Sequence, residues 1–156
     1  MVTPTKDAVK QLYRSVFSKL RGDADLMSLL DDTGDPEHQK VFQSFVDFET
    51  AASLKFDQWV TFHSVNDDPF DTEQTNDVQI IVLDINTWRR GPGSDLADDI
   101  DKRIKQIIDK ADLNTSTLFV WYCDFVNYTK IYEPVPQLWH ISSTFKVMCM
   151  AIEEEA

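Results

Sequence analysis

Residues 78–85, VQIIVLDI, constrain the fold of this chain more than any other segment. In an extended strand, successive side chains point to opposite faces of the sheet. Both sets are apolar here, namely Val78, Ile80 and Val82 on one face and Ile81, Leu83 and Ile85 on the other. The segment is therefore predicted to be a central strand whose two faces must both be covered.

Two other segments have the i, i+3, i+4, i+7 spacing of an amphipathic helix. The first stripe ends before Gly22 and consists of Val9, Leu12, Tyr13, Val16, Phe17 and Leu20. The second begins after Gly93 and consists of Leu96, Ile100, Ile104, Ile107, Ile108 and Ala111. A short additional turn of helix is predicted in DADLMSLL, residues 23–30.

Four further segments, rich in aromatic and β-branched residues, are predicted to be strands. They are VFQSFVDF, LKFDQWVTFHSV, TLFVWYCDFV and QLWHISSTFKVMCMAI. The resulting order has too few helices for a doubly wound sheet. It favours an α+β domain, with a mainly antiparallel twisted sheet and two helices packed on one face. Residues 1–156 form one domain in this interpretation, and the second face of the sheet needs another subunit or a curled sheet to cover it.

Composition excludes several classes of protein. The chain has 156 residues, of which 42% are hydrophobic, so it can bury a core. Its formal net charge of -12 argues against nucleic acid as a ligand, because affinity for phosphate comes from clustered Lys and Arg. The sequence contains neither a membrane-spanning apolar stretch nor a signal-peptide pattern, so no membrane association is expected. Cys123 and Cys149 are expected to be free thiols.

The segment DINTWRRGPGSDLADDIDKRI, residues 84–104, resembles a phosphate-binding strand, glycine loop and helix in outline only. Ser94 is predicted to cap the helix, and three aspartates in its first turns oppose an anion there. No glycine-rich nucleotide motif is present. We expect ordinary helix stabilisation instead, with i, i+4 ion pairs joining Asp98, Asp99 and Asp101 to Lys102, Arg103 and Lys105.

The end of the central strand, Trp88, Arg89 and Arg90, is the candidate interface. Tryptophan and arginine are common anchors of protein interfaces, and Arg89 and Arg90 can pair with carboxylates of a neighbouring molecule. The alternative, that the two arginines are solvated beside a turn, has equal weight from the sequence alone.

The polar segment from residue 66 to residue 77 is long for a loop in a compact domain and carries five acidic residues. These are Asp67, Asp68, Asp71, Glu73 and Asp77. Their spacing does not match a calcium loop, so a solvated acidic loop is the preferred interpretation. We expect the loop to line a lumen or contact a partner, with Phe70 as the apolar anchor on a neighbour.

Catalytic and metal sites are not predicted. The three histidines lie in different elements, and a zinc site built from His63, His140, Cys123 and Cys149 is disfavoured because their spacing matches no zinc motif. Hydrolase and zinc-protease motifs are absent from the sequence. The chain is therefore not expected to be an enzyme or to need a cofactor or metal.

One resemblance covers nearly the whole chain. The helix AVKQLYRSVFSKL, the LMSLL turn, the strand VQIIVLDINTWRRG, the acidic helix start SDLADDIDKRIKQII and the closing segment FVNYTKIYEPVPQLWHISSTFKVMCM occur in that order. This arrangement resembles the tail terminator, or tail completion, proteins of long-tailed bacteriophages. Residues at the positions of the family pattern are Trp88, Gly91, Asp95, Ala97, Ile100, Ile104, Tyr128 and Tyr132. The acidic loop is longer than in that family, which leaves its role open.

The resemblance implies a structural virion protein. Such proteins form an oligomeric ring, usually hexameric, at the head-proximal end of the tail tube, where they end tube polymerisation and offer a head-joining surface. The implied partners are further copies of the chain, the tail tube protein and a head-completion or connector protein, while DNA passes through the lumen without specific binding. The implied location is the neck of the virion, after assembly in the host cytoplasm. Alternatives are another neck ring protein and, less favoured, an acidic inhibitor that mimics DNA.

Overall fold

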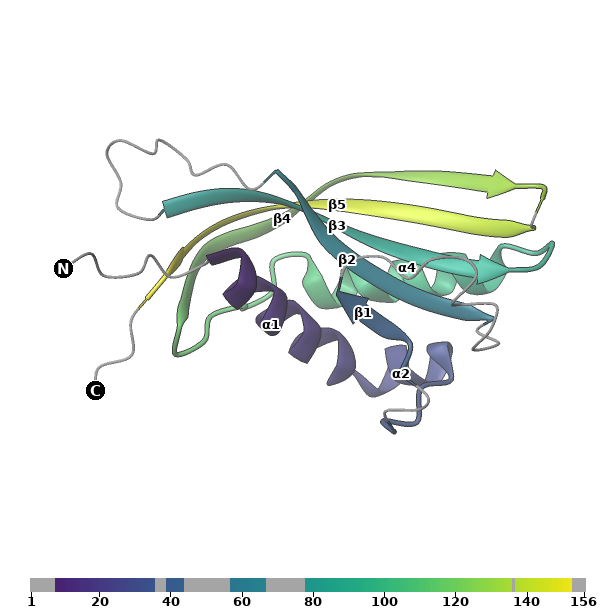
Figure 1. Ribbon diagram of the computed structural model, residues 1–156, viewed down its shortest axis with the longest axis horizontal. Helices are drawn as coiled ribbons and strands as arrows, with labels where there is room; N and C mark the ends of the chain where they lie inside the picture. The colour runs from purple at the N-terminus through teal and green to yellow at the C-terminus, as the bar shows by residue number, and fades with distance from the viewer. Residues whose placement is uncertain (1–7, 36–38, 44–56, 67–77, 136, 153–156) are drawn as a thin grey trace.

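A computed structural model describes residues 8–35, 39–43, 57–66, 78–135 and 137–152 of the chain (Figure 1). The described residues form three helices and five strands. The helices are α1 (Ala8–Arg21), α2 (Ala24–Leu30) and α4 (Asp95–Ile108). The strands are β1 (Val41–Gln43), β2 (Gln58–Asn66), β3 (Val78–Arg90), β4 (Leu118–Glu133) and β5 (Leu138–Ala151).

The strands form one sheet in the order β1-β2-β3-β5-β4. Strand β1 pairs with β2 in parallel, and the other three pairings are antiparallel. Figure 1 shows a long twisted sheet with the helices on one side of it. The predicted α+β class and the mainly antiparallel sheet are confirmed, and the predicted turn at residues 23–30 is the short third helix, α2.

The helices cover one face of the sheet and bury a continuous apolar core. Its helical residues are fully buried: Leu12, Val16, Leu20, Leu26, Leu30, Ile100, Ile104 and Ile108. Its strand residues include Val60, Phe62, Ile81, Leu83, Ile85, Phe145, Val147 and Cys149. The predicted helix stripes and the alternation in residues 78–85 include the core positions on α1, α4 and β3. Burial of this apolar surface is the dominant stabilising contribution to the fold.

The second face of β3 differs from the prediction. Ile81, Leu83 and Ile85 contact the helix side, as predicted, and the other face begins with the half-buried Val78, Ile80 and Val82. Beyond them the second face carries polar and aromatic groups, namely Asp84, Asn86 and Trp88. The apolar residues predicted for the second face, Val78, Ile80 and Val82, are therefore present at the start of β3. From residue 84 onward the strand continues past the predicted apolar set, and hydrogen bonds replace apolar burial there.

Strand β4 is longer than the sequence predicts. A strand was expected over residues 117–126, but β4 continues to Glu133 and pairs with β5 as far as Leu138. Register shifts occur between Val120 and Tyr122 and between Phe125 and Asn127. The segment after residue 126 is mostly exposed and lacks a regular apolar alternation, so its own pattern does not show where the strand ends. Pairing with β5 supplies the hydrogen bonds that keep it extended.

The ion pairs around α4 differ in part from the i, i+4 pairs predicted from the sequence. The pair between Lys105 Nζ and Asp101 Oδ2 forms at 2.8 Å. Arg103 was expected to pair with Asp99, but its Nη2 lies 2.6 Å from Oδ1 of Asp23, the N-cap residue of α2. The guanidinium of Arg103, by hydrogen bonding, holds the pKa of the Asp23 carboxyl below its ordinary value. The contact fixes α2 against α4, a tertiary role that helix spacing alone cannot indicate.

Among the described residues, no helix has the length and apolar character that crossing a bilayer requires.

Candidate assembly surfaces

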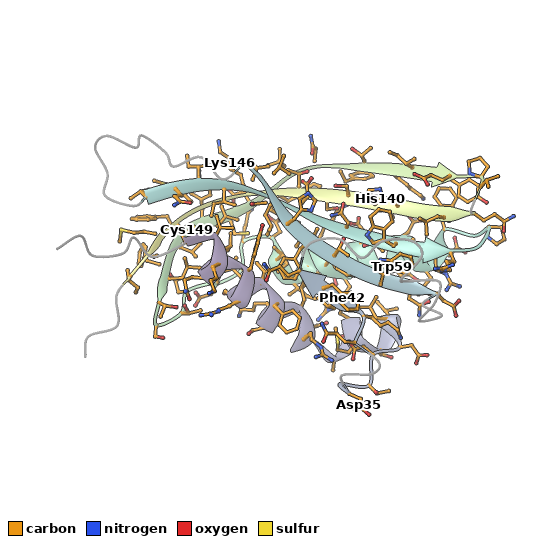
Figure 2. All side chains as sticks on the ribbon, in the orientation of Figure 1. Asp35, Phe42, Trp59, His140, Lys146 and Cys149 are labelled. Carbon is orange, nitrogen blue, oxygen red and sulfur yellow. The ribbon has the colours of Figure 1, made fainter. Side chains whose placement is uncertain are left out.

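Trp88 is held in a stack on the face of the sheet opposite the helices. Its ring lies 6.0 Å from the ring of Trp59 at 9° and 3.8 Å from that of His140 at 6°. Its Nε1 donates a hydrogen bond of 3.0 Å to Oγ1 of Thr61, which is buried. Figure 2 shows His140 and Trp59 in the half of the sheet toward the end of β3, and Cys149 in the other half. Trp88 is therefore fixed by contacts within its own chain.

The two arginines of the candidate interface are also held within the chain. Arg89 Nη1 donates to Gln58 Oε1 at 2.7 Å. The guanidinium carbon of Arg90 lies 5.5 Å from the ring centroid of Trp59, a cation–π contact. Both side chains are partly buried, so the picture of two fully solvated arginines does not fit. Their role in an interface stays a prediction, because contacts inside one chain leave it untested.

Hydrogen bonds connect the stack to a second histidine. His140 Nε2 lies 2.8 Å from Asn86 Oδ1, and Asn86 Nδ2 lies 3.4 Å from His63 Nδ1. Burial lowers the pKa of His140, which favours the neutral ring at pH 7. In the sequence the histidines lie in separate elements, and no local pattern indicates that Asn86 joins two of them. The antiparallel pairing of β2, β3 and β5 brings them together.

His63 and His140 lie on the opposite face of the sheet from the two cysteines. Cys123 and Cys149 are buried in the helix-side core, whereas His63 and His140 contact Asn86 on the other face. Burial raises the pKa of both thiols to about 12, so both remain protonated. The described residues contain no group of three His, Cys, Asp or Glu side chains that could hold a metal ion.

The start of α4 is filled by side chains of the chain itself. Gly91, with φ +111°, makes a turn that an L side chain would strain, and its N–H donates to the carbonyl of Gln137 at 2.9 Å. Lys130 Nζ lies 2.8 Å from Asp98 Oδ1 and 3.2 Å from Ser94 Oγ. Ser94 occupies the N-cap position, but its side chain makes no capping hydrogen bond and contacts Asp98 instead, so the predicted cap is wrong in its chemistry.

The outer edge strand β4 carries a row of exposed apolar side chains that the sequence patterns do not predict. Trp121 is 47% exposed, Val126 54% and Ile131 48%. Phe119 and Tyr128 of the same strand are also exposed, and Phe119 packs edge-on against Trp121 with ring centroids 4.6 Å apart. Tyr128 lies toward the helix side, where Lys105 Nζ is 4.1 Å from the centroid of its ring. Trp121 and Val126 sit at the two register shifts of β4, where an extra residue turns out of the ladder. An exposed apolar edge strand is a template for contact with another chain.

The sequence offers one signal for this row. Aromatic and β-branched residues continue through FVNYTKIY after the strand predicted to end at residue 126. Their exposure could not be predicted, because it depends on β4 being the last strand of the sheet.

The acidic loop falls outside the described residues. This applies to Phe70, Asp67, Asp68, Asp71, Glu73 and Asp77. The expectation that they line a lumen or contact a partner stays a prediction.

Comparison with known proteins adds a family to this geometry. The family model described as tail completion protein gp17 matches residues 14–149. A chain in the virion of a native gene transfer agent particle has the same fold, with a TM-score of 0.70 and 16% identity over 93% of this chain and 99% of that one. The gp17 protein of bacteriophage SPP1 aligns with a TM-score of 0.51 and 16% identity over 97% of this chain and 95% of the other. No curated protein sequence matches the chain at a significant level.

Proposed function

Because the chain belongs to the tail completion protein gp17 family, we propose that it forms a ring at the head-proximal end of a phage tail tube. In this position it ends tube polymerisation and presents the surface to which the head is joined. Its partners are further copies of the chain, in a hexamer by family analogy, together with the tail tube protein and a head-completion or connector protein. It works at the neck of the virion after assembly in the host cytoplasm.

The observation that carries this proposal is the exposed apolar row on β4. Phe119, Trp121, Val126, Tyr128 and Ile131 follow one edge of the sheet. Leaving such a row in water forgoes roughly 25 cal/mol for each Å² of apolar surface that a partner would cover. In the described part of the chain, the strand at the opposite edge of the sheet is β1. A protein that works inside an assembly explains the exposed apolar row better than one that works alone.

The net charge supports an unobstructed lumen. At -12, the chain carries far more carboxylates than cations. Acidic groups facing a channel repel the phosphates of DNA, so the DNA slides without being held. The acidic residues at 67–77 and Phe70 are our candidates for the lumen and for a contact with a neighbour. A structural role also agrees with the two cysteines, which are buried free thiols. It agrees as well with the family, which is described as a tail completion protein.

The proposal is tested by assembling tails with and without the protein. Without it, we expect tails that exceed their normal length and fail to join heads, as seen by negative-stain microscopy. Tails of normal length that join heads would exclude the terminator role. Tails of normal length that fail to join heads would favour another neck ring protein.

Substitution of residues in the β4 row tests whether this exposed edge takes part in assembly. Trp121→Ser and Ile131→Ser together should weaken self-association or binding to the tail tube protein, measured by sedimentation of each mixture. Lys146→Glu is the control, because Lys146 is also an exposed strand residue but lies on β5, outside the row. Unchanged association in the double variant would contradict a role for this edge.

A further inference from the structure

Helix α1 is basic in a chain that is strongly acidic. Its 14 residues contain Lys10, Arg14, Lys19 and Arg21 and no acidic residue. Arg21 is used inside the molecule, where its Nη2 lies 2.9 Å from the buried Asp32 Oδ1. Arg14 and Lys19 are exposed, and neither forms an ion pair with another described residue. Two cations on α1 are therefore available to a partner.

These two cations line a polar depression of about 640 Å³ between α1 and the segment that follows α4. Its lining includes Gln11, Arg14, Ser15, Lys19, Asp112 and Thr117. Two hydrogen bonds fix the walls to each other: Ser15 Oγ donates to the carbonyl of Leu113 at 2.8 Å, and Thr117 Oγ1 donates to Gln11 Oε1 at 2.7 Å. A depression with such walls suits a polar, negatively charged group.

Its single acidic group is already engaged. Asp112 Oδ1 accepts hydrogen bonds from the backbone N–H of Asn114 at 3.0 Å and from its side-chain nitrogen at 2.8 Å. The Asn114 hydrogen bonds and the nearby charge of Lys19 lower the pKa of the Asp112 carboxyl, so its charge offsets part of that of Lys19. No ion pair joins Asp112 to Arg14 among the described residues.

A matching acidic surface lies at the start of α4. Asp95, Asp98 and Asp99 are exposed there. Asp98 pairs with Lys130, whereas Asp95 and Asp99 form no ion pair with a described residue. The depression lies beside the other end of α4, and a helix of 14 residues is about 20 Å long. Figure 1 shows α4 starting where β3 ends and running toward the opposite end of the sheet. The two charged surfaces of one molecule therefore lie too far apart to meet.

We propose that the depression on α1 binds the acidic start of α4 on a second copy of the chain. One surface of each copy then meets a different surface of the next, a head-to-tail contact that closes into a ring when the rotation between copies permits it. The inference rests on the proposed function, because it names the contact between neighbours in that ring. Complementary charge also sets the direction of the contact, since depression against depression and acid against acid would both repel.

The test is a charge exchange between the two surfaces. Arg14→Glu should weaken association of the chain, alone or with tail tube protein, by about tenfold, because a like charge replaces an attractive one. Asp99→Lys should do the same, and Asp99 lies beyond the first turn of α4, where the helix dipole has little effect. The two changes combined in one chain should restore association toward that of the wild type. Lys146→Glu is the control of equal sign, on an exposed residue of β5, and should leave association unchanged.

Three outcomes would overturn this inference, and they are distinguishable from a failure of the proposed function. If single and combined variants associate equally weakly while all remain folded by circular dichroism, the contact is wrong. If all variants assemble and end tails normally, the contact is also wrong, although the proposed function stands. If wild-type chains bind duplex DNA and Arg14→Glu abolishes that binding without changing association, the depression is a phosphate site and the inference is overturned.

Discussion

The two faces of the sheet are stabilised in different ways. On the helix side, Leu83, Ile85 and Phe145 are fully buried among apolar side chains. On the other side, the same strands present Asp84, Asn86 and Thr144, which are joined to each other or to histidines by hydrogen bonds. Apolar burial is non-directional and sensitive to volume, whereas hydrogen bonds and ring stacks are sensitive to the identity and position of single atoms. Different kinds of substitution should therefore lower the stability of the two faces.

The largest effect is expected from loss of volume on the helix side. Phe145→Ala should lower the free energy of unfolding by about 3–5 kcal/mol, because a fully buried ring is replaced by a cavity. The matched control is Thr144→Ala, one residue earlier on the other face, where the hydrogen bond of 2.7 Å to Asp84 Oδ1 is lost. That change should cost about 1 kcal/mol. Equal losses in urea unfolding would show that the two faces do not differ as described.

The next largest loss of stability is expected on the other face, when the Nε1 donor of Trp88 is removed. Trp88→Phe keeps an aromatic ring but removes Nε1, which leaves the buried hydroxyl of Thr61 without that donor. We expect a loss of about 1–3 kcal/mol in the free energy of unfolding. Trp121→Phe is the control, because Trp121 is 47% exposed, and its change should stay within about 0.5 kcal/mol. A Trp88→Phe variant as stable as its control would mean that stacking alone holds this face.

The polar face should also respond to pH. Burial lowers the pKa of His140 in the folded chain below its ordinary value of 6.5, with smaller opposing effects of Glu133 and Asp84 and a supporting effect of His63. Below pH 6.5 the unfolded chain therefore binds a proton that the folded chain does not, so stability falls as pH drops from 6.5 toward the folded pKa.

His140→Gln should flatten the fall between pH 6.5 and 5 in a series of urea titrations. The arginine-paired carboxylates of Asp23 and Asp32 do not interfere in that window, because their pKa values lie below 3.8. Their stabilisation is present above 3.8 and is lost only at lower pH. The prediction fails if the variant keeps the slope of the wild type.

The smallest change in the free energy of unfolding is expected from a substitution on the edge strand β4. Trp121→Ser removes an exposed ring at a register shift of β4 and should change the free energy of unfolding by no more than about 0.5 kcal/mol. The same side chain is part of the row whose contact with a partner we propose. A large loss of stability in the isolated chain, measured by thermal melting, would mean that the row supports the fold and not the assembly.

Sequence alone predicted the helix-side half of the molecule well. The alternation in residues 78–85 assigned Ile81, Leu83 and Ile85 to one face, and the spacing in residues 96–108 placed Ile100, Ile104 and Ile108 toward the core. Both succeed because the strand and helix periods are set by backbone geometry, and a core needs one apolar side from each element.

Partners that are distant in the chain could not be predicted in this way. Arg103 is four residues after Asp99, yet it pairs with Asp23, 80 residues away in the sequence. The sequence shows only an asparagine at position 86, with no indication of its partners. The paired strands place Asn86 between His63 and His140. Side-chain spacing along one element says nothing about which other element is packed beside it.

The apolar and polar periods of the chain thus determine which residues become strands, which become helices and which side of each is buried. Tertiary structure alone decided that β4 is an edge strand, which is why its row from Phe119 to Ile131 is exposed. It also decided that the cations of α1 and the aspartates of α4 lie at different ends of the helix layer. The physical reason is that a side chain's burial and charge partners depend on its neighbours in space, and strand order sets those neighbours through contacts that no local pattern records.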